Sequence, residues 1–374
     1  MDVVANRVNL LRTLQFAQGV VERKSTVPIL GNVLISAEEN TLRIRATDLD
    51  IEAVLLVEAE VRKQGETTVS AAIFLDILRK LSADYVEIKE VSQSLHILSG
   101  SSKFTLLVMP SEQFPKISSD SFDTEFEIEA KSLCRLIDKT RFAMLLDETR
   151  FYLNGIFLHV NEDEGGSMLL RAVATDAHRM ACVGVPLPQG AEGMPAVIVP
   201  RKTVIELRRL LDSLDKNVKV EVASSKIRFS CNNFTLTSKL VDGRFPDYKS
   251  VIPAKEGGCL ELHARKLLEA VDRVSVLSSD KTRLVKMTIG TAKQNNNIII
   301  SVDNPESGSA EEEVEAVYSG EPMDISFNSK YLIDIAAQLG DHTSMIYLRG
   351  KNSAALVIDS QDENSVYVIM PMRV

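Results

Sequence analysis

The chain carries the same order of segments three times. An aspartate follows an apolar, strand-like run at Asp48, Asp176 and Asp303, so successive copies lie 128 and 127 residues apart. Amphipathic segments with an internal acid recur in step with these aspartates. They lie at 71–81, 201–211 and 329–339. Because self-similarity at a fixed period marks repeated structural units, we expect the 374 residues to fold as three copies of one architecture.

Each copy opens with a further amphipathic segment and alternates helices with groups of strands. These opening segments lie at 6–18, 130–142 and 264–277. Between the helical segments, apolar and polar residues alternate with a period of two, as in 41–46, 218–230 and 344–350, which predicts half-buried strands. The pattern predicts an α+β protein in which each copy consists of two βαβββ units. A copy of ~125 residues is a whole domain by size, not one element of a solenoid.

Polar stretches at 118–125 and 252–258 separate the copies. We therefore predict three domains, at 1–122, 123–254 and 255–374. Domains related by rotation close into a ring when the angle between neighbours permits. A pseudo-symmetric arc or ring is one interpretation of the triplication, and gene duplication without a shared purpose is the other.

Basic residues gather in the six amphipathic segments. Over 7–18, 72–81, 131–142, 201–212, 264–277 and 329–339 there are 16 lysines and arginines but only 7 acids, a net charge of +9. Since the whole chain has a net charge of −9, the remainder has −18. Any single helix face is commonly basic because it is solvated. The excess of bases over the six segments together, beside an acidic remainder, indicates that the helices face one polyanion, bound through its phosphates without sequence preference.

Fourteen of these basic residues are candidates for that contact, and we call them the helix bases. They are Arg7, Arg12, Arg79, Lys80, Arg135, Lys139, Arg141, Arg201, Lys202, Arg208, Arg209, Arg265, Lys266 and Arg273. The sequence has no helix-turn-helix signature, and its aromatic content is only 5% with no tryptophan. Base-specific readout and stacking on single strands are therefore not expected.

Motifs for nucleotide binding and catalysis are missing. The sequence contains no GxxxxGK[ST], GxGxxG or GxSxG pattern, and none of its five histidines lies at metal-ligand spacing from another or from a cysteine. No metal or cofactor is expected. The four cysteines lie far apart, the N-terminus does not resemble a signal peptide, and no apolar run is long enough to span a membrane. We expect reduced thiols in a cytoplasmic protein.

One cluster leaves an enzymatic alternative open. Asp176 and His178 form a possible general-base pair within 174–180. The aspartate recurs in all three copies, whereas His178 belongs to the middle copy alone. A recurring aspartate after a strand favours a turn-forming residue, so His178 and Arg179 need another explanation.

Two stretches of the middle copy, 149–158 and 239–253, have no counterpart in the others. The C-terminal run 366–374 has a partial one, because Met370-Pro371 aligns with Met109-Pro110 at the end of the first copy. The tail is therefore the start of an interdomain connector with no domain after it. Its last residues are available for another purpose.

At these residues the chain resembles a known family. The segments 150–155, 174–180, 238–248 and 366–374, together with 25–35, are similar to the bacterial sliding clamps, the beta subunits of DNA polymerase III. The resemblance covers the whole chain. It implies three domains of the DNA-clamp fold, with helices lining a central hole and sheets outside. It also implies that two subunits close head to tail into a ring that encircles double-stranded DNA and does no chemistry of its own.

The family implies a groove that holds short peptides of partner proteins. Those partners are the DNA polymerase III α subunit, the clamp loader and other proteins with a clamp-binding motif. Carried onto this chain, the groove consists of Arg150, Tyr152, Leu153, Thr175, His178, Arg179, Met180, Pro246, Val251, Val368, Ile369, Met370, Pro371, Met372 and Arg373. Methionines suit such a surface because their flexible side chains adapt to several apolar partners.

The chain departs from the family at Phe151, Ala177 and Met180, where tyrosine, glycine and leucine are common. The family also pairs the last strand of the first domain with the third domain of the other subunit. The corresponding residues are Lys103, Phe104, Leu106, Val276, Leu277, Glu311, Glu312 and Glu313. A monomeric three-domain scaffold that binds peptides without encircling DNA is the alternative, and for the acidic run the alternative is a solvated loop.

Overall fold

The computed structural model describes residues 1–22, 26–115, 117, 121–163, 165–212, 214–279, 283–290 and 296–373. They divide into two compact units. Unit 1 consists of Met1–Cys134 and Pro188–Val241, and unit 2 of Arg135–Leu187 and Asp242–Val374. The predicted boundaries near 122 and 254 do not coincide with this division, because the chain passes from one unit to the other within the middle copy.

Helices form at all six segments for which the sequence predicts them. They are α1 (Arg7–Val20), α2 (Ala71–Lys80), α3 (Ala130–Asp138), α4 (Arg201–Leu211), α5 (Ala264–Ser275) and α6 (Ser329–Leu339). Three begin with a side chain that satisfies free N–H groups of the first turn. Asn6 accepts from Val8 and Asn9, Ser70 from Ile73, and Asn328 from Lys330.

Helix α3 ends earlier than the segment 131–142 predicts. It stops at Asp138, and a one-turn 3-10 helix, η3 (Arg141–Ala143), follows it. The Thr140 hydroxyl donates to the Leu136 carbonyl, so the side chain occupies an acceptor of the last turn. Competition of this kind between a threonine side chain and the backbone ends or bends helices.

Unit 1 contains an antiparallel sheet with the order β8-β7-β6-β1-β4-β16-β15-β14-β9, while β3 pairs β4 and β2 pairs both β3 and β5. The strands of this sheet are β1 (Asp2–Asn6), β2 (Asn32–Glu38), β3 (Thr41–Thr47), β4 (Ile51–Lys63), β5 (Gly65–Ser70), β6 (Tyr85–Val91), β7 (Ser94–Ser99), β8 (Ser102–Leu107), β9 (Thr124–Glu129), β14 (Asn217–Val222), β15 (Lys226–Cys231) and β16 (Phe234–Lys239). Unit 1 also contains the short strand β13 (Val197–Pro200), which is not part of this sheet. The β4–β16 pair joins residues of the first and second copies in one sheet.

Unit 2 contains an antiparallel sheet with the order β10-β11-β12-β24-β23-β22-β17-β20-β19-β18-β21. The strands are β10 (Gly155–Glu162), β11 (Met168–Thr175), β12 (Arg179–Pro186), β17 (Gly258–His263), β18 (Leu284–Ile289), β19 (Asn297–Asn304), β20 (Gly308–Ser319), β21 (Met323–Asn328), β22 (Thr343–Leu348), β23 (Ala355–Asp359) and β24 (Asp362–Ile369). The C-terminal run is thus no edge strand, because β24 lies between β12 and β23.

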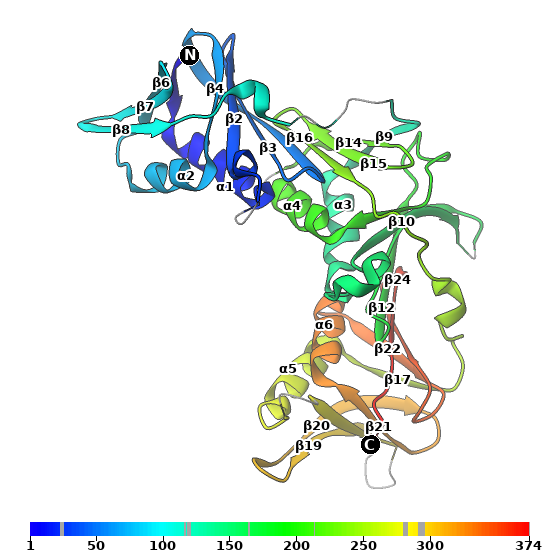
Figure 1. Ribbon diagram of the computed structural model, residues 1–374. Helices are drawn as coiled ribbons and strands as arrows, with labels where there is room; N and C mark the ends of the chain where they lie inside the picture. The colour runs from blue at the N-terminus through cyan, green and yellow to red at the C-terminus, as the bar shows by residue number, and fades with distance from the viewer. Residues whose placement is uncertain are drawn as a thin grey trace. The chain divides into compact units, whose positions relative to one another are not determined.

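Each unit places helices together beside its strands (Figure 1). In unit 1, α1 packs on α2 and β4 through fully buried Leu10 and Leu14. In unit 2, α5 packs on α6 and β20, and the buried side chains include Val271 and Ile335. Burial of these apolar faces is the main stabilising term, at about 25 cal/mol per Å² removed from water. No helix among the described residues is long and apolar enough to cross a membrane.

Candidate functional site

The turn between β11 and β12 is built by the aspartate that recurs along the chain. Asp176 Oδ1 accepts the backbone N–H groups of His178 and Arg179, both at 2.9 Å. The Thr175 hydroxyl accepts from Ala177 N and donates to the Arg179 carbonyl. Ala177 sits at φ 75°, in the left-handed region that glycine adopts most easily. The turn-forming role predicted for Asp176 is confirmed.

The first copy has the same turn and the third does not. Asp48 Oδ1 accepts from Asp50 N and Ile51 N at 3.0 and 2.7 Å. In the third copy the turn acceptor is Asn304, which accepts from Glu306 N at 3.1 Å, so the expectation for Asp303 is wrong by one residue. The difference arises because β19 continues through Asp303 to Asn304 before the chain turns.

Arg179 is almost completely buried, with 7% of its surface exposed. Its guanidinium pairs with Asp176 at 3.0 Å and with Asp334 of α6 at 2.5 Å, and it donates to the Phe142 carbonyl at 2.6 Å. The same group lies 4.3 Å from the ring centre of Tyr331. Arg179 was expected to line the groove, but its side chain instead fixes the turn to α6. Breaking a buried pair of this kind typically costs 3–5 kcal/mol, at an order-of-magnitude level.

Asp176 and His178 do not form the catalytic dyad that the enzymatic alternative requires. Both carboxylate oxygens of Asp176 are already bonded, to the two backbone N–H groups and to Arg179. The exposed imidazole of His178 instead stacks on Tyr331, with ring centres 6.4 Å apart. Tyr331 is a residue that the sequence analysis missed, because its only signal is an aromatic on an otherwise aliphatic helix.

The tail is held by backbone hydrogen bonds on both sides of Met370. Met370 N donates to the His178 carbonyl at 2.9 Å, and Met372 N donates to the Ser326 carbonyl at 2.7 Å. Successive β24 side chains point to opposite faces, so Val368 and Ile369 cannot share one. Val368 lies opposite Met180, whereas Ile369 is 0% exposed on the other face. The expectation that Ile369 lines the groove is therefore wrong for its side chain.

Apolar side chains are exposed around this part of unit 2. Val251 is 56% exposed, Met370 43%, Phe151 51% and Leu146 65%. The sequence analysis missed Phe151 and Leu146 as members of this surface. Leu153, Met180 and Val368 are buried beneath, and His178, Pro246 and Arg373 are exposed while Arg150, Tyr152, Thr175, Pro371 and Met372 are half-buried. Exposed apolar groups clustered in this way mark interaction sites more often than solvated surface.

The connector after the middle copy is anchored by aromatic residues. Phe245 stacks on Phe157 of β10 with ring centres 4.8 Å apart, and the Tyr248 hydroxyl lies 3.0 Å from His159 Nε2. Burial lowers the pKa of His159, so the imidazole is neutral near pH 7. Tyr248 begins the short helix η5 (Tyr248–Val251). These contacts fix η5, and Val251 within it, against β10.

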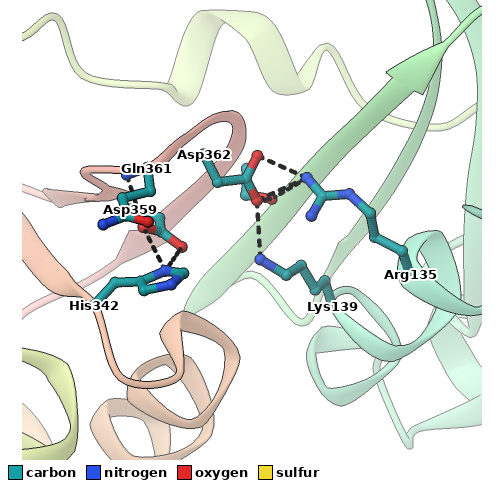
Figure 2. A network of polar contacts seen from close by, with 7 residues as sticks. Arg135, Lys139, His342, Asp359, Gln361 and Asp362 are labelled. Atoms are coloured by element: carbon teal, nitrogen blue, oxygen red, sulfur yellow. Dashed lines mark hydrogen bonds and ion pairs between the residues drawn. The ribbon is translucent and has the colours of Figure 1, made fainter.

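An ion cluster holds the start of β24 against α3 (Figure 2). Asp362 accepts from Arg135 at 2.6 Å and from Lys139 at 2.9 Å, and the Ser365 hydroxyl donates to it at 2.6 Å. Burial opposes ionisation, but these hydrogen bonds outweigh it and lower the pKa of Asp362 to about 2. Beside the cluster, His342 lies 3.1 Å from the buried carboxylate of Asp359.

Most helix bases are already paired within their own unit. Arg135, Lys139, Lys202, Lys266 and Arg273 bind carboxylates of strands or turns, and Arg79, Arg141, Arg208, Arg209 and Arg265 bind acids on or next to their own helices. Arg7 donates to the Leu78 and Ala83 carbonyls at the end of α2. Arg12 lines a cavity, Arg201 is half-buried and Lys80 is exposed. The positive charge of the helices is therefore partly neutralised by nearby acids.

Several strand edges are open in the described part of the chain, and those of β8 and β20 are two of them. β8 has a single neighbour, β7, and the first half of β20 has β19 on one side only, since β17 joins it from Ala316 onward. Leu107 on β8 is 86% exposed and Val276 after α5 is 80% exposed. Of the residues expected at a subunit interface, Lys103, Glu311 and Glu313 are exposed and Phe104, Leu106 and Leu277 are half-buried. Glu312 is paired with Arg273 of the same chain at 2.6 Å.

Metal and thiol chemistry find no support among the described residues. No group of three or more His, Cys, Asp or Glu side chains in that part of the chain could hold a metal ion. All four cysteines lie in the described part of the chain and none forms a disulfide, and burial raises the pKa of the Cys182 thiol. A buried, protonated thiol is a poor nucleophile.

Comparisons with known proteins cover the whole length of the chain. Family models described as the N-terminal, central and C-terminal domains of the DNA polymerase III beta subunit match residues 1–118, 127–247 and 249–373. The beta sliding clamps of Caulobacter vibrioides and Escherichia coli K12 are 42% and 36% identical over 377 and 375 residues, covering 100% of both chains in each case. A crystal structure of a sliding clamp from Bartonella birtlesii bound to griselimycin has a TM-score of 0.94 and 42% identity, over 100% of both chains.

Proposed function

The chain belongs to the family of DNA polymerase III beta subunits, the sliding clamps, and we propose that two copies of it close into a ring around double-stranded DNA. The family inferred from the motifs is confirmed, as are the clamp fold and its three domains of mixed helix and strand. The family consists of processivity clamps and not of enzymes, and its partners are DNA and a polymerase. The domain boundaries 1–122, 123–254 and 255–374 stay predictions.

The open edges of β8 and β20 support the proposed dimer. An unpaired edge exposes N–H and C=O groups that readily pair with another chain. The edge of β8 carries Leu107, the most exposed large apolar side chain described, and the edge of β20 lies beside α5 and Val276. We propose that β8 of one subunit pairs with the open half of β20 of the other. Repeating this head-to-tail contact twice closes a ring.

Sedimentation of two substituted chains tests the dimer. The chain has a mass of 41.3 kDa, so a dimer should give a sedimentation mass twice as large. Leu107→Asp and Val276→Asp each put an unpaired charge into the proposed contact and are expected to yield monomers. Leu146→Asp changes an exposed leucine outside the proposed contact, so this variant is the control and should stay dimeric. A wild-type chain that sediments as a monomer at micromolar concentration would contradict the ring.

The helix bases that best suit DNA are those with exposed side chains. Arg265, Lys266 and Arg273 of α5 are 68%, 57% and 58% exposed, and their pairs with Glu269, Glu315 and Glu312 lie at the surface. Surface pairs of this kind contribute at most ~1 kcal/mol, so they open readily toward a phosphate. We propose that these residues, with Arg79 and Lys80, contact DNA. Arg7, Arg135, Lys139 and Lys202 instead hold elements of their own unit together.

Two measurements test the DNA contact. A chain loaded on a nicked circle should dissociate once the circle is cut linear, because a ring is retained by topology and not by affinity. Replacing Arg265, Lys266 and Arg273 by glutamine should weaken binding to linear duplex and lower the slope of log affinity against log salt by about three. Equal retention on circular and linear DNA would refute encirclement, and an unchanged slope would refute the α5 contacts.

The exposed apolar surface of unit 2 is the proposed peptide groove. The observation that carries this proposal is that exposed Met370 follows the buried Met180–Val368 pair at the end of β24, with the tail fixed at Met370 and Met372 and with Val251 of η5 exposed in the same unit. The exposed residues His178, Pro246 and Arg373 form the rim of the proposed groove. We propose that the α subunit of DNA polymerase III, the clamp loader and other proteins with a clamp-binding motif dock short segments there. We further propose that the chain acts in the cytoplasm, where bacterial DNA lies.

Peptide binding by three variants tests the groove. A fluorescent peptide carrying the docking segment of the polymerase α subunit is titrated, and binding is followed by anisotropy. Deleting residues 370–374 should abolish binding while the dimer persists. Val251→Glu should do the same at a site whose side chain is already 56% exposed, so the fold is undisturbed. Val27→Glu in unit 1, where Val27 is 46% exposed, is the control and should bind normally. Unchanged affinity in the first two variants would refute the groove.

A further inference from the structure

A cavity of about 800 Å³ in unit 2 continues the proposed groove along the same sheet face. Side chains two residues apart on a strand share a face. Met180 and Val368 lie opposite each other in the groove, and Cys182 and Val366 are the next such pair along β12 and β24. Both Cys182 and Val366 line the cavity. Helix η5 borders the cavity with Tyr248 and Lys249 and the groove with Val251, so the two hollows share a wall.

A half-buried guanidinium lies in this cavity. Arg171 of β11 donates to the Asn161 side-chain oxygen and to Cys182 Sγ, the latter at 3.6 Å. Among the described residues, no carboxylate lies within salt-bridge distance of Arg171. Other arginines with little exposure in unit 2, Arg179 and Arg135, each bind a carboxylate. Arg171 is therefore an exception, because burying a cation without a counter-charge is costly.

The groups around Arg171 provide no negative charge. Burial raises the pKa of the Cys182 thiol and of the Tyr248 hydroxyl, so both are protonated at neutral pH. Burial lowers the pKa of His159, which bonds to Tyr248, so the imidazole is neutral. Lys249, exposed at the mouth of the cavity, adds a second positive charge. Arg171 is therefore the charged group beside Cys182 and Tyr248 on the inner wall of the cavity.

The described acids that line the cavity, Glu162, Asp163 and Glu363, form no ion pair with Arg171. Glu162 and Glu363 are exposed to water, where the effective dielectric constant is high and their field is weak. Asp163 Oδ1 is occupied by the backbone N–H groups of Gly165 and Ser167. The inner wall is left with the Arg171 guanidinium, the apolar side chains of Leu356, Ile358 and Val366, and space for a few side chains, while Lys249 and Lys255 are exposed parts of the lining.

We propose that this cavity is a second subsite for partner peptides, and that it takes an aspartate or glutamate flanking the segment that lies in the groove. Arg171 binds the carboxylate, Lys249 adds a contact at the mouth, and the apolar wall receives the methylene groups. The inference rests on the proposed groove and adds a specificity to it: partners with an acidic residue beside the docking segment bind more tightly than partners without one.

Extended peptides test the subsite. The docking peptide of the polymerase α subunit is lengthened at either end by Gly-Glu-Gly-Glu or by Gly-Gln-Gly-Gln, and affinities are measured by anisotropy. At one of the two ends, the wild-type chain should bind the glutamate version about tenfold more tightly than the glutamine version, the gain expected for a charge-assisted hydrogen bond. Arg171→Gln should reduce this ratio to about one, and Lys249→Gln should reduce it by about half.

Control variants separate the subsite from the groove and from general charge effects. Arg171→Lys keeps the charge and should retain part of the preference, and Lys286→Gln, elsewhere in unit 2, should retain all of it. The unextended peptide should bind every variant equally well. Equal affinity of glutamate and glutamine peptides for the wild type overturns the inference, as does a preference that survives both Arg171→Gln and Lys249→Gln. Failure of the unextended peptide to bind the wild type refutes the groove itself.

Discussion

The strand junction β4–β16 in unit 1 and the strand junction β12–β24 in unit 2 share one backbone plan. Each is an antiparallel pairing of five residues, which begins with Ile51 opposite Ser238 in unit 1 and with Arg179 opposite Ile369 in unit 2. An aspartate-bridged turn precedes β4 and β12 alike. The repeat has therefore preserved register and turn while the side chains diverged.

The side chains on the exposed face explain why we propose a groove in unit 2 alone. The counterpart of Met180 is Glu52, whose carboxylate accepts the N–H of Ile117 at 3.3 Å and lies 3.8 Å from Arg45. In unit 1 the chain that follows the first copy is thus hydrogen-bonded onto the junction. In unit 2 the equivalent position is apolar and Val251 beside it stays exposed. Glu52 therefore keeps the unit 1 junction covered by its own chain, whereas apolar Met180 leaves the unit 2 junction open to partners.

The helix side of the two junctions also differs. In unit 2, Arg135 of α3 and Lys139, which directly follows α3, bind Asp362 at the start of β24. In unit 1, α1 and the turn before β16 enclose a cavity of about 540 Å³ that Arg12 and Asn233 line. Strand β24, which carries the proposed groove, is therefore held by ion pairs, whereas its counterpart β16 follows a turn that borders a cavity.

Replacing the first residue of each strand pairing, Arg179 in β12 and Ile51 in β4, should have the largest effect on the free energy of unfolding. Arg179→Ile gives β12 the residue that β4 has at Ile51 and leaves Asp176 and Asp334 without their buried cation. We expect unit 2 to lose about 3–5 kcal/mol of unfolding free energy, measured by urea denaturation with circular dichroism. Adding Asp334→Leu should recover part of the loss, because one uncompensated charge is removed. Ile51→Val in unit 1 should cost only about 1 kcal/mol. Wild-type stability of Arg179→Ile would show that the buried pairs contribute nothing.

Removing the charge latch should have an intermediate effect that depends on pH. The pKa of Asp362 falls from 3.8 to about 2 on folding, so its stabilisation is present above pH 4 and disappears as the pH falls toward 2. Asp362→Asn should therefore cost roughly 2 kcal/mol at pH 7 and nearly nothing at pH 2. Urea midpoints of both chains across this range measure the difference. A difference that is the same at every pH would mean that Asp362 acts through packing and not through charge.

Relieving the turn should have the smallest effect. Ala177 and Leu49 occupy the same turn position with φ of 75° and 79°, where a side chain is strained. Ala177→Gly should raise the unfolding free energy by about 0.5–1 kcal/mol, because glycine adopts this conformation without a steric penalty. Leu49→Gly should gain less, because it also removes a leucine that is only 45% exposed. A loss of stability in Ala177→Gly would show that the turn tolerates alanine at no cost.

Features with a local period could be predicted from the sequence. The six helices lie within a few residues of their predicted ranges because helical periodicity and capping residues such as Asn6 and Asn328 are local signals. The aspartate turns were predictable for the same reason, since Asp48 and Asp176 bond to N–H groups two and three residues away. The exception at Asp303 required knowing where β19 ends.

The site could be predicted only in part, because motif letters do not say which way a side chain points. Arg179 and Ile369 belong to matching motifs, yet one is buried against α6 and the other faces the opposite side of β24. The basic character of the helices was likewise visible, but their partners were not. Arg135 and Asp362 are 227 residues apart, and no pattern in the sequence links them.

By itself, the sequence determined the triplicated architecture, its helices and turns, and the family, since each rests on local periodicity or on contiguous motifs. Only the tertiary structure decided that the C-terminal run is a central strand, that Asp362 latches it, and that Arg171, with no carboxylate partner among the described residues, lies in a cavity beside the proposed groove. The physical reason is that pairing, burial and counter-charge depend on residues brought together from distant parts of the chain, whereas helices and turns depend on neighbours.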